Sequence, residues 1–138
     1  MKDYGTMILR VALGAIYLAQ AYLALFVATP QGTAGFLAKS AGLPWPTVLA
    51  LAVIVLHGVG GAMLVLGLWT RLIAAANAVL MVGGLLAVYV RQGSVLKGAL
   101  LDAATGRAAP AGYEYILLLV AATVAIASLG PGAWSLGR

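Results

Sequence analysis

Four long apolar stretches occupy most of this 138-residue chain, and they limit what it can fold into. They cover residues 6–28, 47–70, 72–90 and 113–129. Each is close to the roughly 20 residues that an α-helix needs to cross the hydrocarbon core of a bilayer. Only 8% of the residues are charged, whereas soluble domains usually carry about 25%. The sequence therefore predicts an integral membrane protein.

The connections between these stretches predict how the helices are arranged. Residues 30–46 and 92–112 are expected to be loops. The first contains a weakly amphipathic piece that could lie at the membrane interface, and part of the second, which mixes polar and apolar residues, could form a short helix against the bundle. The turn at Trp69-Thr70-Arg71 is so short that the second and third helices must be antiparallel neighbours. We therefore expect one transmembrane domain over residues 1–138, an all-α four-helix bundle with up-down-up-down topology.

The positive charge of the chain is typical of membrane flanks rather than of a nucleic-acid surface. The net charge is +5, but the eight lysines and arginines are spread singly over helix ends and loops and form no basic patch. They divide evenly between the two sides, so the positive-inside rule selects no orientation. The chain has no cysteine, which excludes disulfides and iron–sulfur clusters bound by this chain alone, and no metal site is predicted.

The only histidine, His57, lies within the apolar run VLHGVGGAMLVLGLWTR. Three roles stay open for it. A neutral imidazole could hydrogen-bond to Tyr17, Gln20 or a backbone carbonyl. His57 could instead bind a quinone or relay protons to it. Axial ligation of haem is disfavoured, because the chain has no second histidine to complete the usual pair.

Polar and small residues share one face of each predicted helix when positions are placed at 100° per residue. The four stripes are Arg10, Tyr17, Gln20 and Ala24; His57, Gly60, Gly61, Leu64 and Arg71; Asn77, Gly84 and Arg91; and Glu114, Ala121, Ala125 and Ser128. Small residues let membrane helices approach closely. We therefore expect these stripes to face one another or a partner subunit.

The charged residues in the stripes are candidates for a site, although each also has a simpler explanation. Arg10 could extend its guanidinium to the headgroups, and Glu114 could be an interfacial anchor. Their positions along the helices put these two residues at different depths, so we do not expect them to pair. The candidate catalytic residues are His57 and Glu114, and the candidate cofactor-binding residues are Arg10, Tyr17, Gln20, His57 and Arg71.

Several motifs resemble those of the DoxX family of small four-helix membrane proteins. They are MILRVALGAIYLA, GLPWP, HGVGGAMLVLGLWTR, YEYILLLVAAT and the ending GPGAWSL. The resemblance implies a protein of the bacterial or archaeal cytoplasmic membrane with both termini in the cytoplasm. It also implies a link to redox chemistry, since the family takes its name from a subunit of a thiosulfate:quinone oxidoreductase.

The chain departs from the family pattern at three places. His57 stands where relatives typically carry a glutamate, and Gly137 stands where an aspartate is common. The end of the first helix reads AQAYLA, where many relatives have a His-Gly and a lysine. Arg10, Arg71 and Glu114 match the family's charged positions. Histidine retains a group that exchanges protons, but its natural range lies closer to neutral pH.

These features favour an accessory or anchor subunit of a redox or respiratory membrane complex, not catalytic by itself. Its partners would be membrane lipid and other membrane or redox subunits, with quinone or lipid between the helices. A second hypothesis is a quinone-reacting oxidoreductase subunit with its site around His57, Gln20, Arg10 and Arg71. A third is a small-molecule transporter, which would require an oligomer because four helices form only a thin pore.

Overall fold

The computed structural model describes residues 2–89 and 113–137, and within these ranges every regular element is a helix. The predicted loop at 92–112 lies outside the described residues. The elements in chain order are α1 (Lys2–Tyr22), the π-helix η1 (Leu23–Val27), α2 (Thr29–Ala41), α3 (Pro46–Leu66), α4 (Thr70–Gly84), the π-helix η2 (Leu85–Tyr89) and α7 (Tyr113–Leu129). The all-α class is confirmed for this part of the chain.

Three of the helical segments are long and apolar enough to cross a membrane. They are Asp3–Val27, Pro46–Leu66 and Thr70–Ala87, whereas α7 is equally apolar in character but has 17 residues. Large apolar side chains remain on the outward faces, as at Val55, Val79 and Leu118. A helix that is apolar on all sides is typical of a membrane interior.

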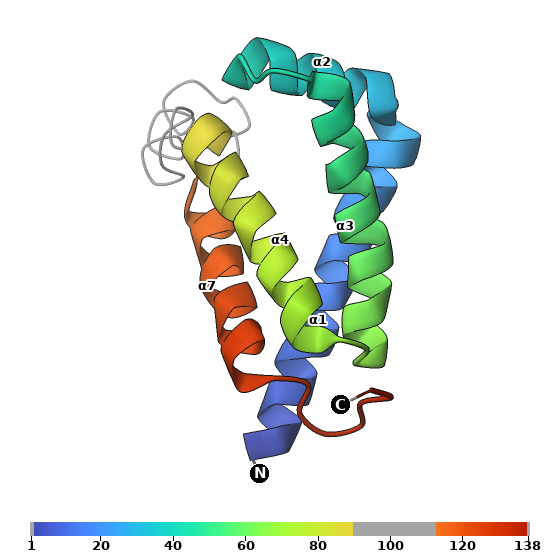
Figure 1. Ribbon diagram of the computed structural model, residues 1–138, viewed down its shortest axis with the longest axis vertical. Helices are drawn as coiled ribbons and strands as arrows, with labels where there is room; N and C mark the ends of the chain where they lie inside the picture. The colour runs from blue at the N-terminus through green and yellow to red at the C-terminus, as the bar shows by residue number, and fades with distance from the viewer. Residues whose placement is uncertain (1, 90–112, 138) are drawn as a thin grey trace, which may run out of the picture.

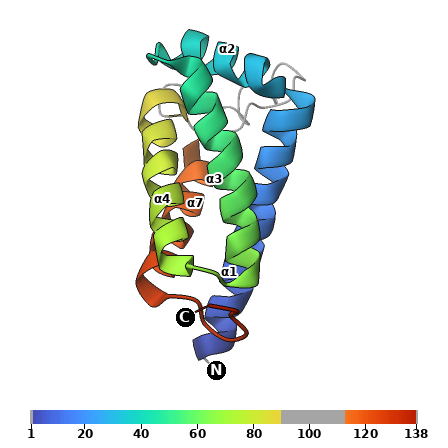
Figure 2. The same cartoon turned by 45° about the vertical axis from the view of Figure 1, so that its right-hand side comes forward.

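The long helices lie side by side, and α2 lies across one end of them (Figures 1 and 2). Both termini lie at the opposite end (Figure 1). α1 packs mainly against α3, and α4 packs mainly against α7. The core between them consists of Leu13, Tyr17, Leu64, Ala74, Met81, Ile116, Leu119 and Ile126.

Helix α2 occupies most of the segment 30–46, for which a loop was predicted, and that prediction was wrong. Thr29 adopts a φ of 64°, which turns the chain away from α1, and Pro30 fits the first turn of the new helix. Ala34 is buried against the bundle, and Gly42 ends the helix with a φ of 59°. The weak amphipathic pattern therefore becomes a helix because the bundle supplies a surface for it.

The connection between α3 and α4 comes earlier than predicted, because the helix expected over 47–70 ends at residue 66. Gly67 has a φ of 75°, and the N–H of Leu68 donates to the Met63 carbonyl at 2.8 Å. This is the Schellman closure that a glycine in the left-handed region permits. The chain then starts α4 at Thr70. The two helices are in contact, as the short turn predicted.

Two adjacent glycines bring α3 into close contact with helices on both sides. A Cβ added at Gly61 would lie 2.9 Å from the Gly14 carbonyl oxygen, and one added at Gly14 would lie 2.7 Å from the Gly61 carbonyl oxygen. A Cβ at Gly60 would lie 2.9 Å from Asn77 Nδ2 on α4. The predicted packing role of these glycines is confirmed by the absence of room for even one methyl group.

The stripe of small residues predicted for the last helix does not form the buried face of α7. That face consists of Ile116, Leu119, Thr123 and Ile126, while Ala121 and Ser128 are exposed. Ser128 satisfies its hydroxyl locally by donating to the Val124 carbonyl at 3.0 Å, so it can face outward. The sequence of α7 is so evenly apolar that periodicity gave no reliable direction.

Replacing Gly61 by alanine should destabilise the protein by about 1–3 kcal/mol, the typical cost of overpacking a close contact. The added methyl group would force α1 and α3 apart at their nearest approach. Thermal unfolding in detergent would measure the effect. Gly83→Ala is the matched control, because a Cβ at Gly83 meets nothing within 4 Å. An equal melting temperature for the two variants would contradict this account.

Candidate functional site

A largely apolar cavity of about 490 Å³ lies beneath α2. Its wall comes from α1, η1, α2, α3, α4 and α7, and the polar side chains among its described lining residues are those of Gln20, Thr33 and His57. The described lining residues are Gln20, Leu23, Ala24, Val27, Ala28, Gly32, Thr33, Phe36, Leu37, Val53, His57, Leu80, Met81, Gly84 and Ile116. A cavity of this size and character suits a small apolar ligand held by a few polar groups.

The imidazole of His57 is held in one orientation by its own helix. Nδ1 lies 2.8 Å from the Val53 carbonyl oxygen, and Nε2 lies 3.3 Å from Met81 Sδ. A carbonyl oxygen can only accept, so Nδ1 must carry the proton. In the neutral ring Nε2 is then an acceptor, and among the described residues it meets only the thioether sulfur. His57 therefore keeps an unused acceptor at the wall of the cavity.

Tyr17 supports the other side of the imidazole. The ring centroids of Tyr17 and His57 are 4.9 Å apart with an interplanar angle of 46°. The Tyr17 hydroxyl lies 2.5 Å from Thr123 Oγ1, and Thr123 Oγ1 donates to the Leu119 carbonyl at 2.6 Å. Thr123 uses its single proton on that carbonyl, so it accepts from Tyr17. This chain of hydrogen bonds fixes the tyrosine ring against His57.

Gln20 and Thr33 complete the polar part of the cavity. Gln20 is half-buried on α1 and lines the cavity with His57. Thr33 donates to the Ala24 carbonyl at 3.2 Å, which ties α2 to η1. The sequence named Gln20 and His57 as candidate cofactor-binding residues, and in the structure both line this cavity.

Arg10 lies at the other end of the bundle, about 15 Å along α1 from Gln20 given the rise of a helix. Its side chain is only 1% exposed. Nη2 donates to the carbonyls of Ala133 and Trp134 at 3.3 and 3.2 Å. A Cβ added at Gly67 would lie only 1.8 Å from Arg10 Nη1, so a side chain at this position would collide with the guanidinium. Arg10 thus fastens the C-terminal segment rather than reaching headgroups or the cavity beneath α2.

Arg71 and Glu114 also lie apart from His57. Arg71 is exposed at the start of α4, near the last turn of α7, where a Cβ at Gly130 would lie 3.0 Å from its Nε. Glu114 is half-buried in the first turn of α7 and is not part of the cavity wall. The sequence-based grouping of His57, Gln20, Arg10 and Arg71 is therefore split between two ends of the molecule.

Two residues at the site were not singled out from the sequence. Met81 follows Asn77 by four positions on the polar stripe of its helix, so the helical period could have indicated it. Thr123 is a polar residue three or four positions from buried apolar residues of α7. Its role required knowledge of which face of α7 is buried.

The family model for DoxX matches residues 5–90. The chain belongs to the DoxX family. The match covers α1 from residue 5 onward and all of α2, α3 and α4, and it therefore includes most of the described wall of the cavity beneath α2, with His57 and Gln20. Neither a curated protein nor a solved structure matches the chain.

Replacing Arg10 by methionine should free the C-terminal segment while leaving the cavity beneath α2 intact. The segment's N–H groups at Leu136 and Gly137 donate to the Leu66 and Gly67 carbonyls, and hydrogen exchange would report their protection. Two hydrogen bonds from a charged donor are lost, each worth about 1.5–3 kcal/mol. We expect faster exchange at these amides.

Lys39→Met is the control for that experiment, because Lys39 is exposed on α2 at the opposite end. Equal protection of the C-terminal amides in both variants would show that Arg10 does not hold the segment.

Proposed function

We propose that this DoxX protein is a membrane subunit of a redox or respiratory complex that binds a quinone beneath α2. The observation that carries the proposal is the apolar cavity of about 490 Å³ with one oriented imidazole on its wall. The volume suits a substituted ring with part of an isoprenoid tail. When bound, the quinone would carry the electrons and protons of the redox step.

The chain's own residues would bind and orient the ligand. The apolar wall excludes water, and Nε2 of neutral His57 can accept a hydrogen bond from the hydroxyl of a reduced quinone. The same nitrogen donates to a quinone carbonyl when the imidazole is protonated. Gln20 offers a second donor and acceptor on the same wall. Val53 keeps Nδ1 occupied, so Nε2 is the nitrogen that faces the ligand.

An accessory role is more consistent with the chain than independent catalysis. The sequence has no cysteine and one histidine, so it cannot by itself hold an iron–sulfur cluster or a bis-histidine haem. Electrons would then come from a partner subunit. The departure at His57 would replace a family carboxylate with an imidazole, whose neutral form has both a hydrogen-bond donor and an acceptor.

The proposed arrangement in the membrane follows from the fold and the family. We propose that α1 with η1, α3, α4 with η2, and α7 form one domain and cross the bacterial or archaeal cytoplasmic membrane in up-down-up-down order. Both termini would lie in the cytoplasm, and α2 would lie at the opposite interface, where the ligand enters from the lipid.

Filling the cavity should abolish quinone binding. Gly84→Leu would place a side chain in the cavity, since Gly84 lines it and a Cβ added there would meet nothing within 4 Å. We expect the dissociation constant for a short-chain ubiquinol to rise about tenfold or more, which corresponds to about 1.4 kcal/mol. Gly83→Leu is the matched control, because Gly83 is next to Gly84 in the chain but is exposed and does not line the cavity. Equal affinity in both variants would place the ligand elsewhere.

The polar part of the site can be tested separately by His57→Leu, which preserves bulk but removes the acceptor. We expect weaker binding of the quinol, but little change for its dimethyl ether, which has no hydroxyl to donate. If both ligands lose affinity equally, His57 acts by shape alone.

The accessory role predicts that the tagged protein brings redox subunits with it when purified in mild detergent. Identification of the co-purifying chains by mass spectrometry, together with a visible absorption spectrum, would test this. A lone protein with only phospholipid bound would contradict the assignment to a redox complex.

A further inference from the structure

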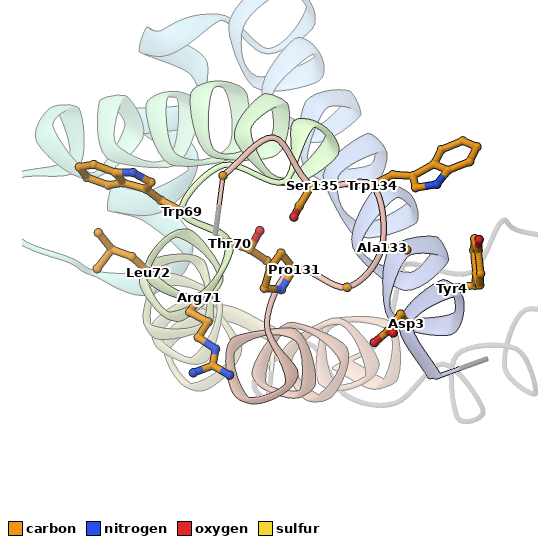
Figure 3. A pocket seen from close by; sticks show the side chains of 12 residues that line it. Asp3, Tyr4, Trp69, Thr70, Arg71, Leu72, Pro131, Ala133, Trp134 and Ser135 are labelled. Carbon is orange, nitrogen blue, oxygen red and sulfur yellow. The ribbon is translucent and has the colours of Figure 1, made fainter.

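A second cavity, of about 930 Å³, lies at the end of the bundle that carries both termini. It is formed by the start of α1, the turn before α4 and the C-terminal segment 131–137 (Figure 3). Among the residues that the structure describes, it shares no lining residue with the cavity beneath α2. The proposed quinone site therefore gives no account of it.

The cavity contains a buried hydroxyl that lacks a partner. Thr70 is the first residue of α4 and is 3% exposed, and its Oγ1 has no hydrogen-bond partner in the described part of the chain. Figure 3 shows its side chain directed into the space beside Pro131 and Ser135. Buried hydroxyls are normally paired, so this one is placed to meet a ligand.

The groups around Thr70 favour a negative charge. α4 is a 15-residue helix, and its first N–H groups, at the positive end of its dipole, have no intrahelical acceptor. Arg71 lines the cavity, and Asp3 is the one acidic residue on its wall. Arg10 does not line the cavity, but its Nη2 donates to the carbonyls of Ala133 and Trp134, which do, and its Nε and Nη1 are unpartnered among the described residues. Among the described residues, the wall thus carries one guanidinium group and a helix N-terminus against a single carboxylate, and the Arg10 guanidinium adds positive charge next to the C-terminal part of that wall.

The cavity lies at the depth of lipid headgroups. Trp69 and Trp134 line it and are 67% and 81% exposed, and Figure 3 shows their rings pointing outward on opposite sides. Exposed tryptophans mark the interface between the hydrocarbon and water. A phosphate group in the headgroup layer or in the adjacent water could therefore reach Thr70 and Arg71.

We propose that this cavity binds a phosphate group through Thr70 Oγ1, the N-terminal amides of α4 and the guanidinium of Arg71. These are the donors that proteins commonly use for phosphate. Arg10 contributes positive potential from behind while it holds the C-terminal segment that forms one wall. The phosphate belongs to an anionic phospholipid or to a small soluble phosphate ester, and the experiment separates these sources.

The test measures ligands bound to the full-length protein after delipidation in detergent. Native mass spectrometry would compare the number of phosphatidylglycerol and phosphatidylcholine molecules bound per protein. Calorimetry would measure the affinity for inorganic phosphate and for glycerol 3-phosphate. We expect Arg71→Gln to weaken binding about tenfold through loss of a charge-assisted hydrogen bond. Thr70→Val should weaken it about threefold, whereas Thr70→Ser, which keeps the hydroxyl, should bind like the wild type.

Lys39→Gln controls for the loss of one positive charge, because Lys39 lies on α2 at the other end. Selective binding of phosphatidylglycerol that only the Arg71 and Thr70→Val variants lose supports a lipid phosphate. If glycerol 3-phosphate binds instead of the lipid, and the same two variants lose that binding, the ligand is a soluble phosphate ester. The proposal is overturned if the wild type binds neither, or if Arg71→Gln binds as tightly as Lys39→Gln.

Discussion

The close approach of α3 to its two neighbours is the contact on which the rest of this structure depends. Gly61 lets the backbone of α3 meet that of α1 at Gly14, and Gly60 lets the same turn of α3 meet Asn77 of α4. In lipid there is little hydrophobic force between helices, so close packing of small residues must supply the attraction. The same turn begins three residues after His57, which fixes where the imidazole lies relative to Tyr17 and Met81.

The cavity beneath α2 lies where two helices depart from α-geometry. η1 follows α1 and contributes Leu23, Ala24 and Val27 to the wall, while η2 begins directly after Gly84. π-helical turns often occur at functional sites, because the extra residue per turn shifts side chains that regular packing would hold. Here they lie at the end of the bundle covered by α2. The apolar cavity, the oriented imidazole and the irregular helices therefore occupy one region.

The opposite end of the molecule is organised by a buried cation. Arg10 donates to two carbonyls of the C-terminal segment, and Gly67 leaves room for the guanidinium. Burying an arginine inside a helix bundle is costly, and the two hydrogen bonds from Nη2 offset part of that cost by holding the segment after α7 against α1 and the α3–α4 turn. The molecule consequently has two separate chemical environments, an apolar one beneath α2 and a positive one near the termini.

The sequence by itself determined the membrane class, the helical fold, the family and the close packing at Gly60 and Gly61. These follow from composition, the length of the apolar runs and the periodicity of small residues, all of which are local properties. It also indicated His57 and Gln20 as candidate binding residues. The tertiary structure alone decided that α2 is a helix covering a cavity, that α7 buries the face with Thr123, and that Arg10 binds the C-terminal segment far from His57. The reason is that helical periodicity gives the direction in which a side chain points around the axis of its helix. Which residue that side chain then contacts depends on how segments far apart in the chain pack together.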